Sequence, residues 1–175
     1  MFQLGGSGAY QWHTFYGGAG NDYSFGIALD SQANPVIVGS CVASWLGDGG
    51  TQPKYNPNNP SADSMGCILS LTSAGSYGWH TFYGGDTVNS FNGVAVDSKN
   101  YIYAVGRSNR GWLGPGGQLP LHAHTGTTDI SLIMLTSGGD YVEHDFFGSS
   151  TGIDQGDVIA VDAAGGLVIG GDSRH

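Results

Sequence analysis

Two pairs of residues in the sequence have the types and spacing of a small binding site. His122 and His124 are separated by one residue, so both imidazoles lie on the same face of an extended segment. Two imidazoles can begin a zinc site, but the sequence offers no apparent third ligand. Trp45 and Trp112 stand in glycine-rich stretches, SWLGDGG and GWLGPGG, where an aromatic ring on a rigid loop can stack on a sugar. These four residues and Asp48, in the first stretch, are the candidate ligand-binding residues.

Each of these residues also has a structural interpretation. Both tryptophans can fold back and cap their own strands, and their repetition favours this because structural residues recur with a repeated unit. Three further histidines occupy equivalent positions on predicted outer strands, where their side chains diverge: His13, His80 and His144. We expect them to be half-exposed strand residues, and we predict neither a metal site nor a cofactor.

Acidic residues recur at one position, directly after a strand and before a tight turn: Asp30, Asp97 and Asp162. Calcium requires several oxygen ligands, and a ring of carboxylates is one interpretation. The other is that each side chain bonds nearby backbone N–H groups in an Asx turn. A repeat holds equivalent residues apart, so we predict turn formers.

The elements that carry these residues form a repeat. The phrase WHTFYGG occurs at 12–18 and again at 79–85, and a degenerate third copy spans 143–173. Each copy contains short β-rich runs such as FGIALD, PVIVGS and CILSL, bounded by Gly, Asn, Asp and Ser. Four antiparallel strands repeated at this period are typical of β-propeller blades. We therefore predict an all-β propeller.

The repeated pattern W-x-T-x-x-G-G…D…G-[IV]-A-x-D…[VI]-x-G-x-[ST] resembles the bacterial beta-propeller repeat family (SBBP). The third copy departs from it, with Glu143 at the Trp position and Ser149 at the second Gly. The resemblance implies a propeller on an extracellular or cell-surface bacterial protein. It implies no catalytic residues, so none are carried over.

The predicted boundaries make about three blade-equivalents in a single propeller segment. Residues 1–18 supply strands three and four of one blade, 19–85 and 86–148 are blades, and 149–175 supply strands one and two of a further blade. Three blades are too few for a closed ring. We expect the open edges to be paired by a six-bladed ring of two chains, by a filament, or by adjoining sequence.

The two cysteines flank the long insertion between the second and third strands. In the next repeat Cys41 and Cys67 are replaced together by Ser108 and Ser131. Joint replacement is what a disulfide across the base of a loop would produce. We predict a bridge between Cys41 and Cys67, with two free buried thiols as the alternative, and the bridge implies an oxidising compartment.

Charge and motifs narrow the function. With 5 Lys and Arg against 14 Asp and Glu, the formal net charge is −9, which disfavours nucleic acid as a partner. No apolar run is long enough for membrane insertion. No common nucleophile, metalloprotease, P-loop or Rossmann motif occurs, so an enzyme is the least favoured class.

We therefore expect a non-enzymatic, extracellular structural or protein-interaction module that binds a protein partner or itself. A surface assembly or filament would need such a module. The alternative is a lectin-like propeller that binds glycans through the loop tryptophans.

Overall fold

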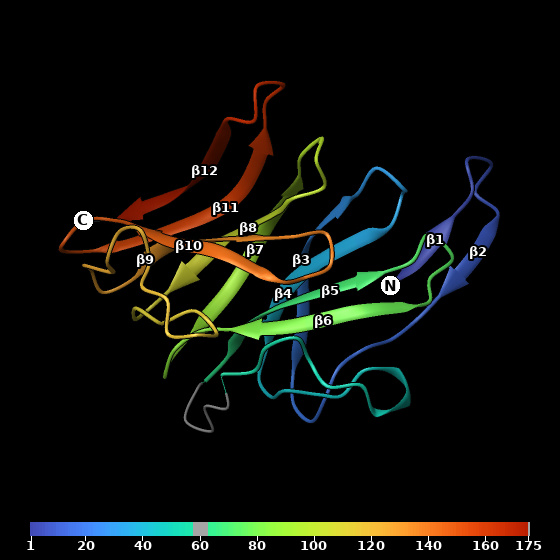
Figure 1. Cartoon of the computed structure of the whole chain (residues 1–175), viewed down its shortest axis with the longest axis horizontal. Helices are drawn as coiled ribbons and strands as arrows, with labels where there is room; N and C mark the ends of the chain where they lie inside the picture. The colour runs from blue at the N-terminus through green and yellow to red at the C-terminus, as the bar shows by residue number, and fades with distance from the viewer. Residues whose placement is uncertain (58–62, 175) are drawn as a thin grey trace.

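A computed structural model describes residues 1–57 and 63–174 of the chain. It contains two four-stranded antiparallel sheets flanked by two hairpins (Figure 1). The two hairpins are β1 (Phe2–Leu4) with β2 (Tyr10–His13), and β11 (Ile153–Val161) with β12 (Leu167–Arg174). Sheet I consists of β3 (Asp22–Leu29), β4 (Pro35–Cys41), β5 (Met65–Leu71) and β6 (Tyr77–Tyr83). Sheet II consists of β7 (Asn89–Val96), β8 (Ile102–Ser108), β9 (Asp129–Leu135) and β10 (Tyr141–Phe147). The prediction of an all-β chain with four-stranded antiparallel sheets is confirmed.

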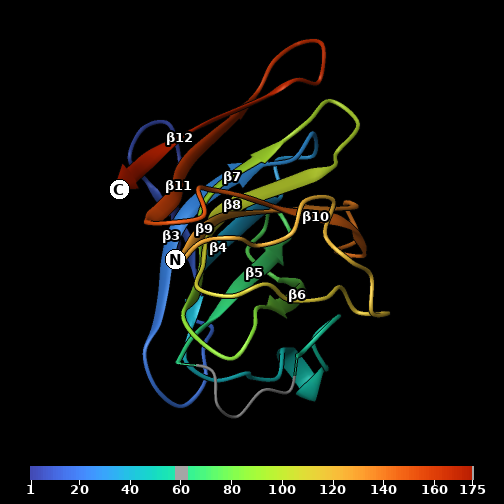
Figure 2. The ribbon, with the colours of Figure 1, turned by 90° about the vertical axis from the view of Figure 1, so that its left-hand side faces the viewer.

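The strands of each sheet follow one another in chain order, so every sheet is a meander. The first strand of sheet I contacts the first strand of sheet II, which in turn contacts β11. These three strands lie side by side in Figure 2. Among the described residues, no helix has the length and apolar character needed to cross a bilayer.

The main hydrophobic core lies between sheet I and sheet II. Val36 and Val38 of β4 and Phe91 of β7 are buried there, and Val94 and Val96 of β7 pack against them. Alternation along each strand sends these β-branched and aromatic side chains to one face. Full burial of such a side chain contributes about 1.5–3 kcal/mol, so this interface holds the two sheets together.

The repeated aspartates form turns, as predicted. Asp30 Oδ1 accepts hydrogen bonds from the backbone N–H groups of Gln32 and Asn34, each at 2.8 Å. Asp97 and Asp162 accept the equivalent pairs of bonds in the next two units. Burial opposes ionisation of Asp30, but the hydrogen bonds from Asn34 and Gln32 outweigh it and lower the pKa of this carboxyl.

The repeated WHTFYGG phrase has an architectural role. Trp12 of the first hairpin lies on the turn after β5, where its Nε1 donates to Ser73 O at 3.2 Å. Gly75 in that turn has a φ of +81°, and a Cβ there would lie 2.4 Å from the Trp12 ring. Trp79 and Gly139 repeat this contact between sheet I and sheet II. The tryptophan therefore packs its outer strand against the turn of the following sheet.

Replacing Asp30 with Ala should lower the free energy of unfolding by about 1 kcal/mol, because two backbone N–H groups lose their acceptor. Asp30→Asn keeps an acceptor oxygen and should cost less. Chelation by EDTA should leave the melting temperature of the wild type unchanged, since the aspartates bond backbone groups. Thermal unfolding measures all three effects. A large fall in melting temperature in EDTA would show that a cation holds the turns.

Candidate binding site

The first candidate residue, Trp45, lies in a cluster of aromatic rings on sheet I. Its indole stacks on the imidazole of His80, with ring centroids 4.0 Å apart and an interplanar angle of 8°. It also stacks on Tyr16, at 5.9 Å and 29°. The edge of Phe82 meets the indole at 5.6 Å. Trp45 thus folds back over its own sheet.

Trp112 makes the same contacts one unit later. Its indole stacks on His144 at 4.1 Å and 10°, and Tyr83 and Phe146 lie at 5.7 Å and 5.5 Å. Its exposed fraction is 8%, and it belongs to the core cluster. Both tryptophans therefore have the capping role that the sequence offered as one alternative. Trp112 is buried, whereas Trp45 is half-buried. The lectin-like alternative stays a prediction.

Two buried histidines hold these loops in place. His80 Nε2 lies 2.9 Å from Trp45 O, and His80 Nδ1 lies 2.8 Å from the hydroxyl of Tyr77. A carbonyl oxygen only accepts, so Nε2 carries the proton and the neutral ring accepts the tyrosine hydroxyl at Nδ1. His144 makes the same two bonds, to Trp112 O and the Tyr141 hydroxyl. Each histidine thus fixes one tryptophan loop through one stack and one hydrogen bond.

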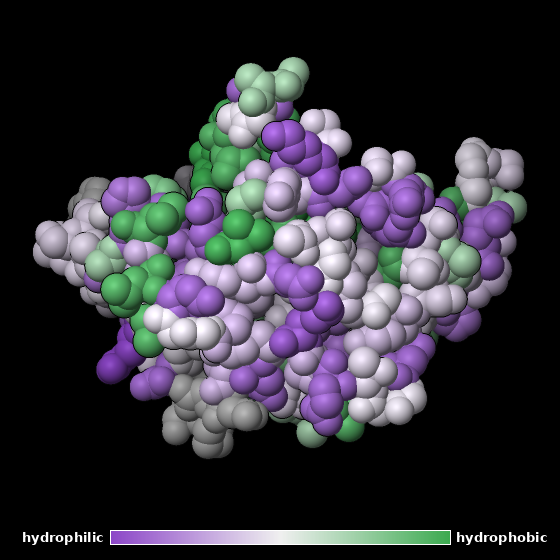
Figure 3. All heavy atoms as spheres, in the orientation of Figure 1, coloured by the Kyte–Doolittle hydropathy of each residue, from purple (hydrophilic) through white to green (hydrophobic). Residues whose placement is uncertain are grey.

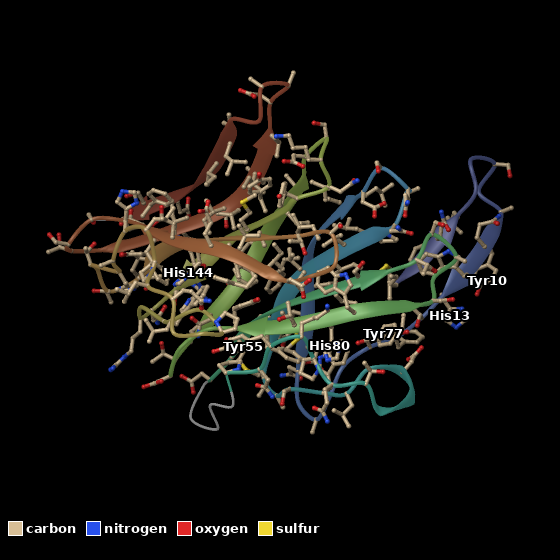
Figure 4. The ribbon with its side chains drawn as sticks, viewed as in Figure 1. Tyr10, His13, Tyr55, Tyr77, His80 and His144 are labelled. Carbon is tan, nitrogen blue, oxygen red and sulfur yellow. A yellow bond between two sulfur atoms is a disulfide. The ribbon has the colours of Figure 1, made fainter. Side chains whose placement is uncertain are left out.

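The expectation that the repeated histidines are half-exposed is wrong for two of them. His80 and His144 are each 1% exposed, because the tryptophan loops lie over them. His13 is exposed, although its Nδ1 also lies 2.6 Å from a tyrosine hydroxyl, that of Tyr10. Figure 4 shows these side chains on β2, β6 and β10. A signal was present in the sequence, since a tyrosine precedes each of these histidines by three residues.

The remaining candidate residues do not converge on a common ligand. His122 Nδ1 lies 2.8 Å from Asp145 Oδ2, whereas His124 Nε2 lies 3.0 Å from Ser108 O. Asp48 is exposed in a short 3₁₀ helix, Asp48–Gly50, and accepts a 3.1 Å hydrogen bond from the Tyr16 hydroxyl. Within residues 1–57 and 63–174, no group of three or more His, Cys, Asp or Glu side chains could hold a metal ion.

Cys41 and Cys67 form a disulfide between β4 and β5, with Cα atoms 6.0 Å apart. The bridge changes a hydrogen bond that the other units keep. Ser108 Oγ donates to Asn89 Oδ1 at 2.6 Å, and Ser173 Oγ donates to Asp154 Oδ1 at 2.5 Å. The β-ladder of sheet I pairs Asp22 with Cys41 instead, and the buried Asp22 Oδ1 has no partner among the described residues. The disulfide replaces this hydroxyl.

Beside the disulfide, a cavity of about 130 Å³ opens on one face of sheet I. Tyr16, Asp22 and Trp45 line it together with the two cysteines. Ile27 and Leu29 of β3 are 58% and 59% exposed. We call the exposed surface formed by Ser24, Ile27 and Leu29 the open face of sheet I.

Intact-mass measurement after alkylation without reductant should detect no free thiol. Reduction should lower the free energy of unfolding by about 3 kcal/mol, as expected for a loop of this length. The double variant Cys41→Ser/Cys67→Ser loses the bridge but gains a hydroxyl for Asp22, so it should be more stable than the reduced wild type. Alkylation of both thiols in protein isolated without reductant would contradict the prediction.

Stability should fall as the pH is lowered from about 7 to about 5. Burial lowers the pKa of His80 and of His144, more than their bonds to the tryptophan carbonyls raise it. The unfolded chain therefore binds protons near pH 6.5 that the folded chain rejects, and folding is favoured above that pH.

Denaturant unfolding at several pH values measures this slope, and His80→Gln should reduce it. The pKa of Asp30 is lowered from the ordinary value of an aspartate, so this carboxyl stays ionised throughout the window and does not contribute to the difference. An unchanged slope in His80→Gln would show that the buried imidazole does not control the pH dependence.

Comparison with known proteins assigns no family: no family model matches the sequence, and no curated protein matches it. The resemblance to the bacterial propeller repeats therefore depends on the repeated motif alone. Any functional conclusion therefore depends on the contacts and exposed surfaces of the chain itself.

Proposed function

We propose that the chain is a non-enzymatic β-propeller segment whose role is to bind a protein through the open face of sheet I. One observation carries the proposal. Ile27 and Leu29 are more than half exposed, whereas Val94 and Val96, at the same register positions of sheet II, pack in the core. Sheet II has a neighbour that covers this face, and on sheet I the same apolar surface is open.

The open face has the features of a protein contact. Ser24 of this face lines a cavity together with Tyr16, Trp45 and the two cysteines, so aromatic rings and sulfur atoms adjoin it. Fully desolvated apolar and aromatic groups dominate the energetics of most interfaces. On sheet II the equivalent face is in contact with sheet I. Phe91 stands there at the register position that Ser24 has on sheet I, and it packs against Gly66.

The titratable groups support a structural role rather than a catalytic one. The two histidines with perturbed pKa values lie under tryptophan rings, with both ring nitrogens hydrogen-bonded. A general base requires an accessible nitrogen within reach of a substrate. These histidines act as supports for loops.

An extracellular or cell-surface location agrees with the disulfide, since such bridges persist in oxidising compartments. The formal charge of −9 supports a protein rather than nucleic acid as the partner. We propose a bacterial surface assembly as the setting, on the strength of the motif resemblance.

Light scattering of the isolated chain tests the open face. We expect weak self-association at tens of micromolar, because an exposed apolar sheet face associates with available apolar surface. Ile27→Asp/Leu29→Asp should stay monomeric with little change in melting temperature, since both side chains are largely exposed. The matched control is Phe15→Asp, which removes an 84% exposed ring outside this face and should associate like the wild type.

Equal association of the wild type and the double variant would show that the open face is not the contact surface. A wild-type chain that stays monomeric throughout this concentration range would contradict the proposal as well.

A further inference from the structure

We call β3, β7 and β11, the first strands of sheet I, sheet II and the last hairpin, the innermost strands; they pack against one another at glycines. Gly26 of β3 pairs with Val38 across sheet I, and Gly93 of β7 pairs with Val105 across sheet II. A Cβ at residue 26 would lie 2.8 Å from the backbone oxygen of Asn92, and a Cβ at residue 93 would lie 2.8 Å from that of Asp157. Real side chains essentially never approach so closely. Each glycine therefore admits the backbone of the next innermost strand.

In the last hairpin this pair is reversed. Val158 of β11 pairs with Gly170 of β12, so the valine lies on the innermost strand and the glycine beside it. The three pairs are equivalent, because each follows a one-residue bulge in the ladder, at Phe25, Asn92 and Asp157. Val158 is 64% exposed, and one of its methyl groups lies 3.1 Å from the Cβ position of Gly170. The valine fills the space that a further innermost strand would need.

The two outer surfaces of the stack are thus different. The bulge of sheet I lies at Phe25. The equivalent bulges, at Asn92 and Asp157, supply the backbone oxygens that lie against Gly26 and Gly93. The open face of sheet I presents Ile27 and Leu29, the counterparts of the valines that pack on β4. The last hairpin presents exposed Val158 and Val168, and Figure 3 shows hydrophobic residues gathered over it.

We infer that the open face of sheet I accepts a strand pair from another polypeptide that has glycine on its innermost strand and valine opposite, as in Gly26–Val38. The inference rests on the proposed function and names the partner of the same face. The chain's own last hairpin is a poor partner because Val158 would meet the backbone of β3 at Phe25. The partner strand pair therefore differs from the last hairpin in having no Cβ at this position.

Restoring the glycine–valine order makes a donor from the chain itself. The donor carries Val158→Gly/Gly170→Val together with Ile27→Asp, so its own open face is blocked. The acceptor is the wild type. Gly170 does not have a positive φ, so its backbone admits a valine. Sedimentation velocity of the mixture should show a one-to-one complex.

Two matched donors control the steric argument, and both keep Ile27→Asp. One has the native Val158 and Gly170, and the other has Val158→Ala/Gly170→Val, which retains the offending Cβ. Both should bind the wild type at least about tenfold more weakly than the glycine donor. Val158→Gly alone serves as the donor if the double change lowers the melting temperature below the measuring range.

The outcomes separate the two proposals. If all donors bind equally, the glycine does not select the partner, and the inference is wrong while the open face still binds. If the glycine donor binds no better than the native one, although Ile27→Asp/Leu29→Asp abolishes wild-type association, the inference again fails alone. If the glycine donor also binds the Ile27→Asp/Leu29→Asp acceptor equally well, the contact lies elsewhere and the proposed function fails too.

Discussion

The distance between neighbouring innermost strands is the constraint on which the rest of the structure depends. At Gly26 and Gly93 one backbone lies where a side chain would otherwise stand. This approach brings Val94 and Val96 onto the valines of β4, and the core forms between the sheets. A β-carbon at Gly26 would push the two sheets apart and open that core, whose packing density leaves little room for adjustment. A β-carbon at Gly93 would in the same way push sheet II away from the last hairpin.

Away from the contacts between β3, β7 and β11, the structure uses aromatic stacking and buried hydrogen bonds rather than aliphatic packing. The loops after β4 and β8 each carry a tryptophan, and fixing a loop segment in one conformation costs conformational entropy. The indoles of Trp45 and Trp112 fix these segments by stacking on the neutral imidazoles of two buried histidines, His80 and His144. A buried polar ring is costly unless both nitrogens are satisfied, and here each has a partner. The loops that first suggested ligand binding are therefore part of the scaffold.

Much of this fold could be predicted from the sequence, because the repeat aligns residues that make equivalent contacts. Alternating apolar residues indicated the strands, Asp30 and its counterparts indicated the turns, and the paired Cys-to-Ser replacement indicated the disulfide. The burial of His80 could not be derived in this way, since period-two alternation identifies a face but not what a distant loop places over it. The roles of Gly26 and Val158 were also hidden, because they depend on contacts between sheets rather than along a strand.

The aromatic stacks also determine how the chain comes apart. Tyr83 belongs to β6 of sheet I, yet its ring packs at a tilt against Trp112 in the loop of sheet II. Tyr16, which follows the first hairpin, stacks on Trp45 in the loop of sheet I. Each unit thus contributes one tyrosine ring to the aromatic cluster of the next unit. Unfolding of one unit removes that contact from the unit that follows. In a nearest-neighbour description of folding, the contacts of these tyrosines couple adjacent units, so we expect the units to unfold together rather than one by one.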